Sequence, residues 1–412
     1  MNALPGGISS SIRRLPDLDG RPFKVARATG AHLVDETGRH FVDHALAMGA
    51  TLLGHAHPAV VSACHAALER GAMPGFPHDL EAEAASALAT LSPRLARATF
   101  VTTGSEAVHL ACRIARKATG RPVVAKIAGG FDGWYDDIAL GWSGSPEADL
   151  TGGRPVVQGI TLLRFNDLAD LDALFAERSD IAAVLVEPML ANAGSLQAEP
   201  GYFEALVAKA HRQGALVIAD EVLMGLRLSR GLTSDCVGLD ADLVTMGKAI
   251  GSGVPVAAVL GTRDAFAAVE DGRAVRAGTY HGNPLATAAV VASLGALAEA
   301  DYAALLAAGD ALRASIVESF ARHGVAVSTS GYGSVFSLWF TQTPPTRYEA
   351  AKAALRPEAS MALHLALRRR GIVTIPGGWA RVFLSFAHTP ADLARSAEAF
   401  AESIAEVAPL LD

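Results

Sequence analysis

The chain has 412 residues, and its 35 lysines and arginines against 42 aspartates and glutamates give a net charge of −7. Half of the residues are hydrophobic and 19% are charged, which excludes a disordered chain and allows a large buried core. A basic excess is lacking, so we expect no nucleic-acid partner. A chain of this length usually divides into two domains.

The cysteines and the amino-terminal segment indicate a cellular compartment. Cys64, Cys112 and Cys236 lie far apart and form no CxxC pair, which favours a reducing compartment and argues against disulfides or a zinc site. Residues 1–18 lack the apolar stretch of an export signal. The apolar stretch at 285–298 is shorter than the about 20 residues that a membrane span needs. We therefore expect a soluble cytoplasmic protein with no membrane contact and no metal.

Short apolar runs alternate with helical stretches through the middle of the chain. Residues 32–45 first predict two short strands around a turn at 36–38. Helical patterns at 106–119 and 203–213 then separate runs of the kind found in buried strands. Those runs are ARATFVTTG, RPVVAKIAGG, IAAVLVEPM, GALVIADEV, ADLVTMGKA and PVAAVLGTR. This alternation predicts an α/β fold with a mostly parallel central sheet and helices on both faces.

The last third of the chain has a different pattern. Amphipathic helices begin near residue 305, and two strand-like runs at 333–340 and 380–388 flank a helical stretch at 357–370. We therefore predict a large domain at 60–298. A smaller α+β domain would be built from both chain ends, 1–59 and 299–412.

The first candidate site is a turn at residues 102–106, Thr-Thr-Gly-Ser-Glu, between a strand-like run and a helix. Free backbone N–H groups at a helix N-terminus bind phosphate, and Gly104 allows a close approach. The alternative is an ordinary strand-to-helix turn with a capping serine. Neither GxxxxGK[ST] nor GxGxxG occurs here, so nucleotide-binding loops of those types have little support.

Three charged residues follow other apolar runs. Lys248 lies between glycines after the run 242–247, where a desolvated amine could form a Schiff base; the alternative is a solvated loop lysine. Asp220 and Glu187 also close apolar runs, and each alone could be a helix cap or a solvated group. Together, a phosphate turn, a carboxylate and a lysine are what pyridoxal 5'-phosphate (PLP) requires for its phosphate, its ring nitrogen and its aldehyde.

Six motifs then connect the chain to a known family: TTGSEA, GGFDGWYDD, VEPMLANAG, IADEVLMGLR, DLVTMGKAIGSG and GTYHGNP. With these motifs the chain resembles the class III, fold-type I PLP-dependent aminotransferases, in their glutamate-1-semialdehyde aminomutase-like branch. The resemblance runs from about residue 5 to residue 388. It implies PLP as cofactor, an amino acid and a keto acid as substrates, and a homodimer with shared active sites.

The resemblance also implies roles for single residues around the cofactor ring. Lys248 would be the Schiff-base lysine and proton shuttle, and Asp220 would pair with the pyridinium nitrogen. Val222 and Phe131 would pack on the two ring faces.

Further cofactor contacts follow from the same resemblance. Gly104 and Ser105 would bind the phosphate through their backbone N–H groups, and Thr279 would reach that phosphate from the neighbouring subunit. Asn192 would lie near the 3-hydroxyl group, with Glu187 as its support.

Substrate contacts are implied near the amino terminus. Ser10 and Arg13 match positions that bind the substrate carboxylate in the aminomutase, and an arginine can meet a carboxylate with two hydrogen bonds. Met48 would line the substrate site in place of a tryptophan of the aminomutase.

Several departures from the aminomutase pattern bear on the reaction. Asp132 replaces a histidine, residues 378–380 lack an expected glutamate, and the loop at 141–158 is shorter. These changes weaken an assignment that needs the intermediate to be retained, and they favour a ping-pong aminotransferase with an external amino donor and a keto-acid acceptor. The alternatives are glutamate-1-semialdehyde 2,1-aminomutase, an amino-acid racemase or epimerase, or a non-catalytic module, against which the presence of Lys248 argues.

Overall fold

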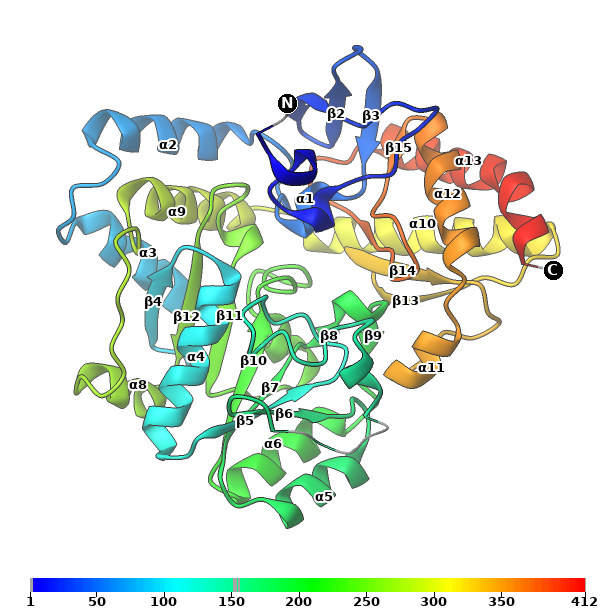
Figure 1. The fold of residues 1–412 in the computed structure, drawn as a ribbon. Coiled ribbons are helices and arrows are strands. Elements are labelled where there is room, and N and C mark those ends of the chain that lie inside the picture. Colours follow the sequence, from blue (N-terminus) through cyan, green and yellow to red (C-terminus); the bar gives the residue numbers. More distant parts are fainter. Residues whose placement is uncertain (1–2, 151–153, 155, 412) are drawn as a thin grey trace.

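The computed structural model describes residues 3–150, 154 and 156–411, drawn in Figure 1. Its centre is a seven-stranded sheet with the strand order β4-β12-β11-β10-β7-β5-β6. The strands are β4 (Arg97–Val101), β5 (Val123–Ile127), β6 (Ile160–Leu163), β7 (Ile181–Val186), β10 (Leu216–Glu221), β11 (Leu243–Met246) and β12 (Ala257–Gly261). All six apolar runs singled out in the sequence form strands of this sheet. The seventh strand, β6, was not predicted.

Strand direction brings the carboxyl ends of most strands to one edge of the sheet. β5, β6, β7, β10 and β11 are parallel, and β12 runs antiparallel to both β11 and β4. β4 therefore points the same way as the parallel strands. The predicted mostly parallel α/β sheet is confirmed, and the segments that follow β4, β7, β10 and β11 leave it on the same side.

Helices cover both faces of this sheet, as expected. α4 (Gly104–Thr119) and α8 (Arg263–Glu270) pack together on one face, and α5 (Leu168–Glu177) and α6 (Tyr202–Arg212) cover the other. Successive side chains of β10 point to opposite faces of the sheet. Ile218 belongs to the first core, beneath α4 and α8, whereas Val217 and Ala219 belong to the second core, beneath α5 and α6. Cys112 lies buried in the first core, as its position on the apolar face of α4 predicts.

Two smaller sheets complete the fold. One joins β1 (Val25–Thr29), β2 (His32–Asp35), β3 (His40–Asp43) and β15 (Ile372–Val373), and the other joins β13 (Ser328–Tyr332), β14 (Val335–Trp339) and β16 (Val382–Phe383). A two-stranded pair is formed by β8 (Met189–Leu190) and β9 (Leu196–Gln197). The predicted strands at 32–45 are confirmed, whereas the strand expected at 380–388 pairs only at β16. β15 pairs with β3, so the two chain ends share a sheet, and this supports the proposed small domain.

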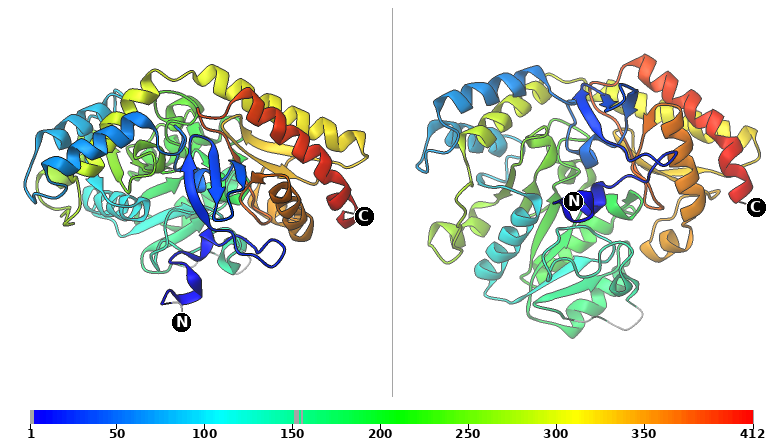
Figure 2. Two further views of the ribbon diagram at one scale, coloured as in Figure 1. Left: turned by 90° about the horizontal axis from the view of Figure 1, so that it is seen from above. Right: turned by 45° about the horizontal axis from the view of Figure 1, so that its top comes forward.

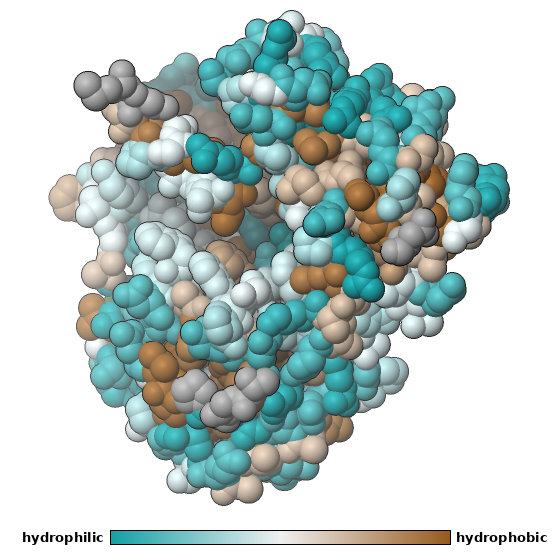
Figure 3. Space-filling model, turned by 45° about the vertical axis from the view of Figure 1, so that its right-hand side comes forward, coloured by the Kyte–Doolittle hydropathy of each residue, from teal (hydrophilic) through white to brown (hydrophobic). Residues whose placement is uncertain are grey.

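The remaining helices surround these sheets. They are α1 (Leu46–Gly49), α2 (Pro58–Arg70), α3 (Asp79–Ala89), α7 (Thr233–Val237), α9 (Pro284–Ala298), α10 (Tyr302–Arg322), α11 (Tyr348–Ala353), α12 (Pro357–Arg369) and α13 (Pro390–Val407). Within the described part of the chain, no single helix is long and apolar enough to cross a membrane. Only the pair α9 and α10 reaches that length and composition, with a bend of 79° between them. The face drawn in Figure 3 is mainly hydrophilic, with apolar side chains in small groups.

Candidate active site

A cavity of about 200 Å³ opens where the carboxyl ends of the central strands meet. It brings together residues that are far apart in the sequence. Its walls are Thr103, Gly104, Ser105, Phe131, Asp132, Gly133, Glu187, Asn192, Asp220, Val222, Leu223 and Lys248. Every cofactor-binding residue expected from the sequence is in this set except Thr279. Ligands of α/β folds bind at this edge of the sheet, so the cavity is the candidate active site.

Lys248 supplies the reactive amine of the cavity. It follows β11 directly, as the first residue of a short 3₁₀ turn, and its φ of +46° is a strained value for a residue other than glycine. Burial lowers the pKa of Lys248 to about 8, although the nearby Asp220 carboxylate favours the charged form. A fraction of the amine is therefore unprotonated near neutral pH and can act as a nucleophile or base.

Asp220 faces this lysine from the end of β10. Its Oδ1 atom accepts hydrogen bonds of 2.9 Å from the Val222 backbone N–H and from Thr245 Oγ1. Burial, followed by the negative charge of Asp132, raises the pKa of Asp220 to about 7. Its Oδ2 atom accepts no hydrogen bond from any residue that the structure describes, which leaves it available to a ligand. A positively charged group of a ligand beside Oδ2 would favour the ionised form of Asp220.

The first turn of α4 forms an anion cradle. Thr103, rather than the serine, is its N-cap, and a capping box uses the N–H of Glu106. The backbone N–H groups of Gly104 and Ser105 donate to none of the described residues, so they remain free for a phosphate. A Cβ atom at position 104 would lie 2.7 Å from Val222 Cγ1, so only glycine fits here without displacement.

Glu187 holds two walls of the cavity together. Its Oε1 accepts a hydrogen bond of 3.2 Å from the Phe131 N–H, and its Oε2 accepts one of 3.2 Å from the Ala191 N–H. Burial, followed by the charges of Asp132 and Asp220, raises its pKa well above the usual value. The ring of Phe131 stacks on Trp142, with centroids 6.2 Å apart. Glu187 thus positions the loops that carry Phe131 and Asn192.

A buried ion pair in the wall was not predicted from the sequence. Lys126 lies inside β5 with no exposure, and its Nζ is 2.8 Å from Asp132 Oδ2. The same Nζ donates to the carbonyl oxygens of Gly130 and Ile138. Lys126 therefore fixes the segment 130–138, which includes Phe131. A lysine within the otherwise apolar run RPVVAKIAGG was the signal that could have revealed it.

Four predicted residues lie outside this cavity. Thr279 is exposed beside a separate hollow of about 400 Å³, which Met73 and Phe76 also line. Ser10 is partly buried and Arg13 is exposed, in an amino-terminal segment that projects from the body of the molecule (Figure 2). Met48 packs beside the core cluster that includes Phe383. Their roles with a partner subunit or a substrate remain predictions.

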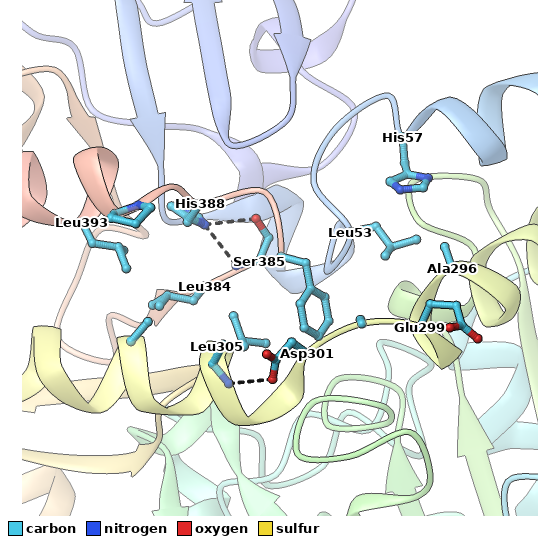
Figure 4. A pocket seen from close by; sticks show the side chains of 15 residues that line it. Leu53, His57, Ala296, Glu299, Asp301, Leu305, Leu384, Ser385, His388 and Leu393 are labelled. Carbon is cyan, nitrogen blue, oxygen red and sulfur yellow. Dashed lines mark hydrogen bonds between the residues drawn. The ribbon is translucent and has the colours of Figure 1, made fainter.

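A larger cavity of about 480 Å³ lies between the α9–α10 junction and the segment before α13 (Figure 4). His57, Asp301 and His388 line it among leucines and alanines. Asp301 is occupied as the N-cap of α10, and His388 accepts a hydrogen bond from the Ser385 N–H. Lysine is not among its lining residues, so we assign the chemistry to the smaller cavity.

Comparisons with known proteins agree with this geometry. The family described as aminotransferase class-III matches residues 17–404. Glutamate-1-semialdehyde 2,1-aminomutase of Nitratidesulfovibrio vulgaris is 38% identical over 399 residues, covering 95% of this chain and 93% of that protein. A solved transaminase with PLP bound is 29% identical, with a TM-score of 0.86 over 98% of this chain and 95% of that one. A β-phenylalanine aminotransferase from Variovorax paradoxus is 30% identical, with a TM-score of 0.87 over 98% and 91% of the two chains.

Proposed function

Because the chain belongs to the class III aminotransferases, PLP-dependent enzymes of fold-type I, we propose that it moves an amino group between an amino acid and a keto acid. The amino group would be α or β to the carboxylate, and the two half-reactions would follow a ping-pong order. The observation that supports this most strongly is a lysine with a lowered pKa facing a buried carboxylate across a cavity that also contains a free helix N-terminus.

The residues present fit PLP. Bound PLP supplies an aldehyde that joins to amines and a ring that withdraws electrons from the amine-bearing carbon. The N–H groups of Gly104 and Ser105 would hold its phosphate, and Oδ2 of Asp220 would hold the proton on its ring nitrogen. Phe131 and Val222 line the cavity, where they would pack against the ring and exclude water from the reacting atoms.

Lys248 would carry the proton during the reaction. Burial lowers the pKa of its Nζ atom, so part of the amine is unprotonated. This atom would accept the proton from the amine-bearing carbon of the substrate and donate it to the carbon on the other side of the transferred nitrogen. Lys248 starts the 3₁₀ turn and is not in a flexible loop, so its Cα is fixed while the long side chain moves between these positions.

Amino transfer is favoured over rearrangement by residues around the site. An aminomutase keeps one intermediate through both halves of its reaction, and the positions at which this chain departs from the aminomutase pattern include Met48, Asp132 and the segment 378–380. Asp132 is part of the buried pair with Lys126, so this change alters the cavity wall itself. Glutamate-1-semialdehyde 2,1-aminomutase activity is the second candidate, since the relative with 38% identity carries that name. A racemase or epimerase on the same scaffold is the third.

We also propose that the enzyme works as a homodimer. Thr279 and Tyr280 are exposed, and Tyr280 keeps 64% of its surface open to solvent. Phe76, beside the same hollow, is 79% exposed. A second copy of this chain would cover these side chains and bring Thr279 to the partner's phosphate site.

The Lys248→Ala variant tests the catalytic assignment. We expect it to fold and bind PLP without a covalent link, and to lose turnover with every amino donor. The Lys209→Ala variant removes a partly buried lysine on α6, far from the cavity in the sequence, and serves as a control that should keep activity. Normal turnover by Lys248→Ala would refute the assigned role.

A further inference from the structure

Asp132 is a buried acid in the wall of the candidate active site. It lines the same cavity as Asp220 and Lys248 and is 3% exposed. The aminomutase pattern has a histidine at this position, and a histidine is neutral or positive where an aspartate is negative. The cavity of this chain therefore differs in charge from that pattern.

Lys126 holds this acid in place. Its Nζ lies 2.8 Å from Asp132 Oδ2 and donates hydrogen bonds to the carbonyl oxygens of Gly130 and Ile138. An ammonium group has three N–H donors, so all three are used. Because Gly130 and Ile138 lie on either side of Asp132 in the chain, the loop that carries this carboxylate is fixed on both sides.

The charge of Asp132 faces the other acids of the cavity. A Cβ atom built on Gly130 would lie 3.1 Å from Asp132 Oδ2 and 3.5 Å from Glu187 Oε1, so both carboxylates lie on the same side of this glycine. Burial and then the negative charge of Asp132 raise the pKa of both Glu187 and Asp220, and that of Asp220 reaches about 7.

The remaining ionisable neighbours do not replace this charge. The Lys248 amine favours the ionised form of Asp220, and Glu187 supplies no full negative charge because burial keeps its proton in place. Cys112 of α4 stays a neutral thiol, since burial raises its pKa to about 12. Asp132 is therefore the main negative charge that acts on Asp220.

Stability alone is a weak explanation for such a pair. Taking two charges out of water offsets most of their mutual attraction, and apolar residues of similar size are often as stabilising or more so. Every other residue of β5 is apolar and buried. The lysine and its acid interrupt that pattern next to Asp220, which favours a role in the site.

We propose that the Lys126–Asp132 pair supports Asp220 electrostatically: Asp132 fixes a negative charge beside Asp220, and this charge strengthens the hold of Asp220 and the cofactor ring nitrogen on the proton between them. The inference rests on the proposed function and adds a positioning pair to it. Asp132 acts through Asp220 and is not itself a catalytic residue. The same field favours a positive charge on the ring nitrogen, because an added negative charge stabilises a cation nearby.

A purely structural role is the competing explanation. Lys126 ties down the segment 130–138, which includes Phe131. If that were its whole function, loss of the pair would lower stability and weaken PLP binding, while Asp220 would titrate as in the wild type.

The test compares Asp132→Asn, which keeps the shape and an oxygen for Lys126 but removes the charge, with Asp132→Glu, which keeps the charge but changes the length. The first readout is a carbon-13 NMR titration of the Asp220 carboxyl group in the cofactor-free protein, assigned by its loss in Asp220→Asn. The second is nitrogen-15 NMR of bound PLP labelled at the ring nitrogen, across the same pH range. Asp172→Asn is the matched control, since Asp172 also pairs with a lysine, Lys209, but is exposed.

We expect Asp132→Asn to lower the pKa of Asp220 from about 7 by about 1, which is a tenfold loss of proton affinity. The ring nitrogen of bound PLP should also lose its proton at a lower pH than in the wild type. Asp132→Glu should titrate close to the wild type, and Asp172→Asn should leave both titrations unchanged.

An unchanged Asp220 titration in Asp132→Asn, or an equal change in Asp172→Asn, would overturn the inference. If Asp132→Asn does not fold, the double variant Lys126→Met with Asp132→Leu takes its place; it leaves no charge of the pair unpaired and should show the same fall in the pKa of Asp220. Failure of the wild type to bind PLP would instead contradict the proposed function, and the titration of the cofactor-free protein would still decide the role of Asp132.

Discussion

Replacing Gly104 with alanine perturbs the cofactor site at its tightest contact. The new Cβ would lie 2.7 Å from Val222 Cγ1 and 3.1 Å from its Cγ2, well inside the about 3.5–4.0 Å of a favourable carbon–carbon contact. The backbone of Val222 cannot retreat easily, because its N–H is bonded to Asp220 Oδ1. The Val222 side chain must therefore turn into the cavity, where the cofactor ring would lie.

Overpacking of this kind costs about 1–3 kcal/mol. Because the cavity can accept the displaced side chain when PLP is absent, most of that free energy should be lost from PLP binding and little from folding. We therefore expect PLP affinity to fall about 5- to 150-fold, since 1.4 kcal/mol is a factor of ten. The melting temperature of the cofactor-free variant should stay near that of the wild type.

The assay is a fluorescence titration of the cofactor-free protein with PLP. Val222→Ala in the same chain removes the two methyl groups that clash, so the double variant should regain much of the lost affinity. Gly295→Ala, where an added Cβ meets no atom within 4 Å, is the matched control and should bind PLP normally. Wild-type affinity in Gly104→Ala, or no recovery in the double variant, would refute the reasoning.

Three other predictions concern buried charge and the proposed dimer. The pKa of Asp220 is raised to about 7, so its ionisation destabilises the cofactor-free fold as pH rises. Asp220→Asn should therefore be more stable than the wild type in urea unfolding at pH 8. A gain in stability of the same size at pH 4 would contradict this. Lys126→Met leaves the Asp132 charge unpaired and should lower the free energy of unfolding by about 3–5 kcal/mol. Adding Asp132→Leu should restore stability, and thermal and urea unfolding of the single and the double variant measure the two effects. Mixing subunits of Lys248→Ala with subunits of Thr279→Ala should restore one intact site in each hybrid dimer, and activity no higher than the sum of the parents would exclude shared sites.

The sequence predicts the central sheet well because its strands are buried on both faces and lie between clear helical patterns. Strand β6 was not predicted, although Ile160–Leu163 is a fully buried apolar run of four residues, as is the predicted strand β11. The strand expected at 380–388 is shorter than predicted: most of its residues are apolar, but only Val382 and Phe383 pair with β14. An apolar segment can be predicted to be buried, but whether it pairs as a β-strand depends on partner strands that are distant in the sequence.

The same distinction applies to the candidate site. Gly104, Asp220 and Lys248 follow apolar runs, so their shared edge can be inferred from strand order alone. Arg381 lines a different cavity and meets Ala191 across 190 residues, and no local pattern marks that contact. Thr279 is exposed in a single chain, so a role in the site depends on a second subunit that one sequence does not place.

The central claim is that an amino group is transferred to an external acceptor, and single-turnover mixing tests it most directly. The holoenzyme is mixed with a panel of α- and β-amino acids without any keto acid, while the visible absorbance of the bound cofactor and the products are followed. We predict that at least one amino acid removes the absorbance band and releases one equivalent of its keto acid, and that adding a keto acid restores the band. Isomerisation of glutamate-1-semialdehyde or inversion of an amino acid, with no keto acid released and no acceptor needed, would contradict the claim.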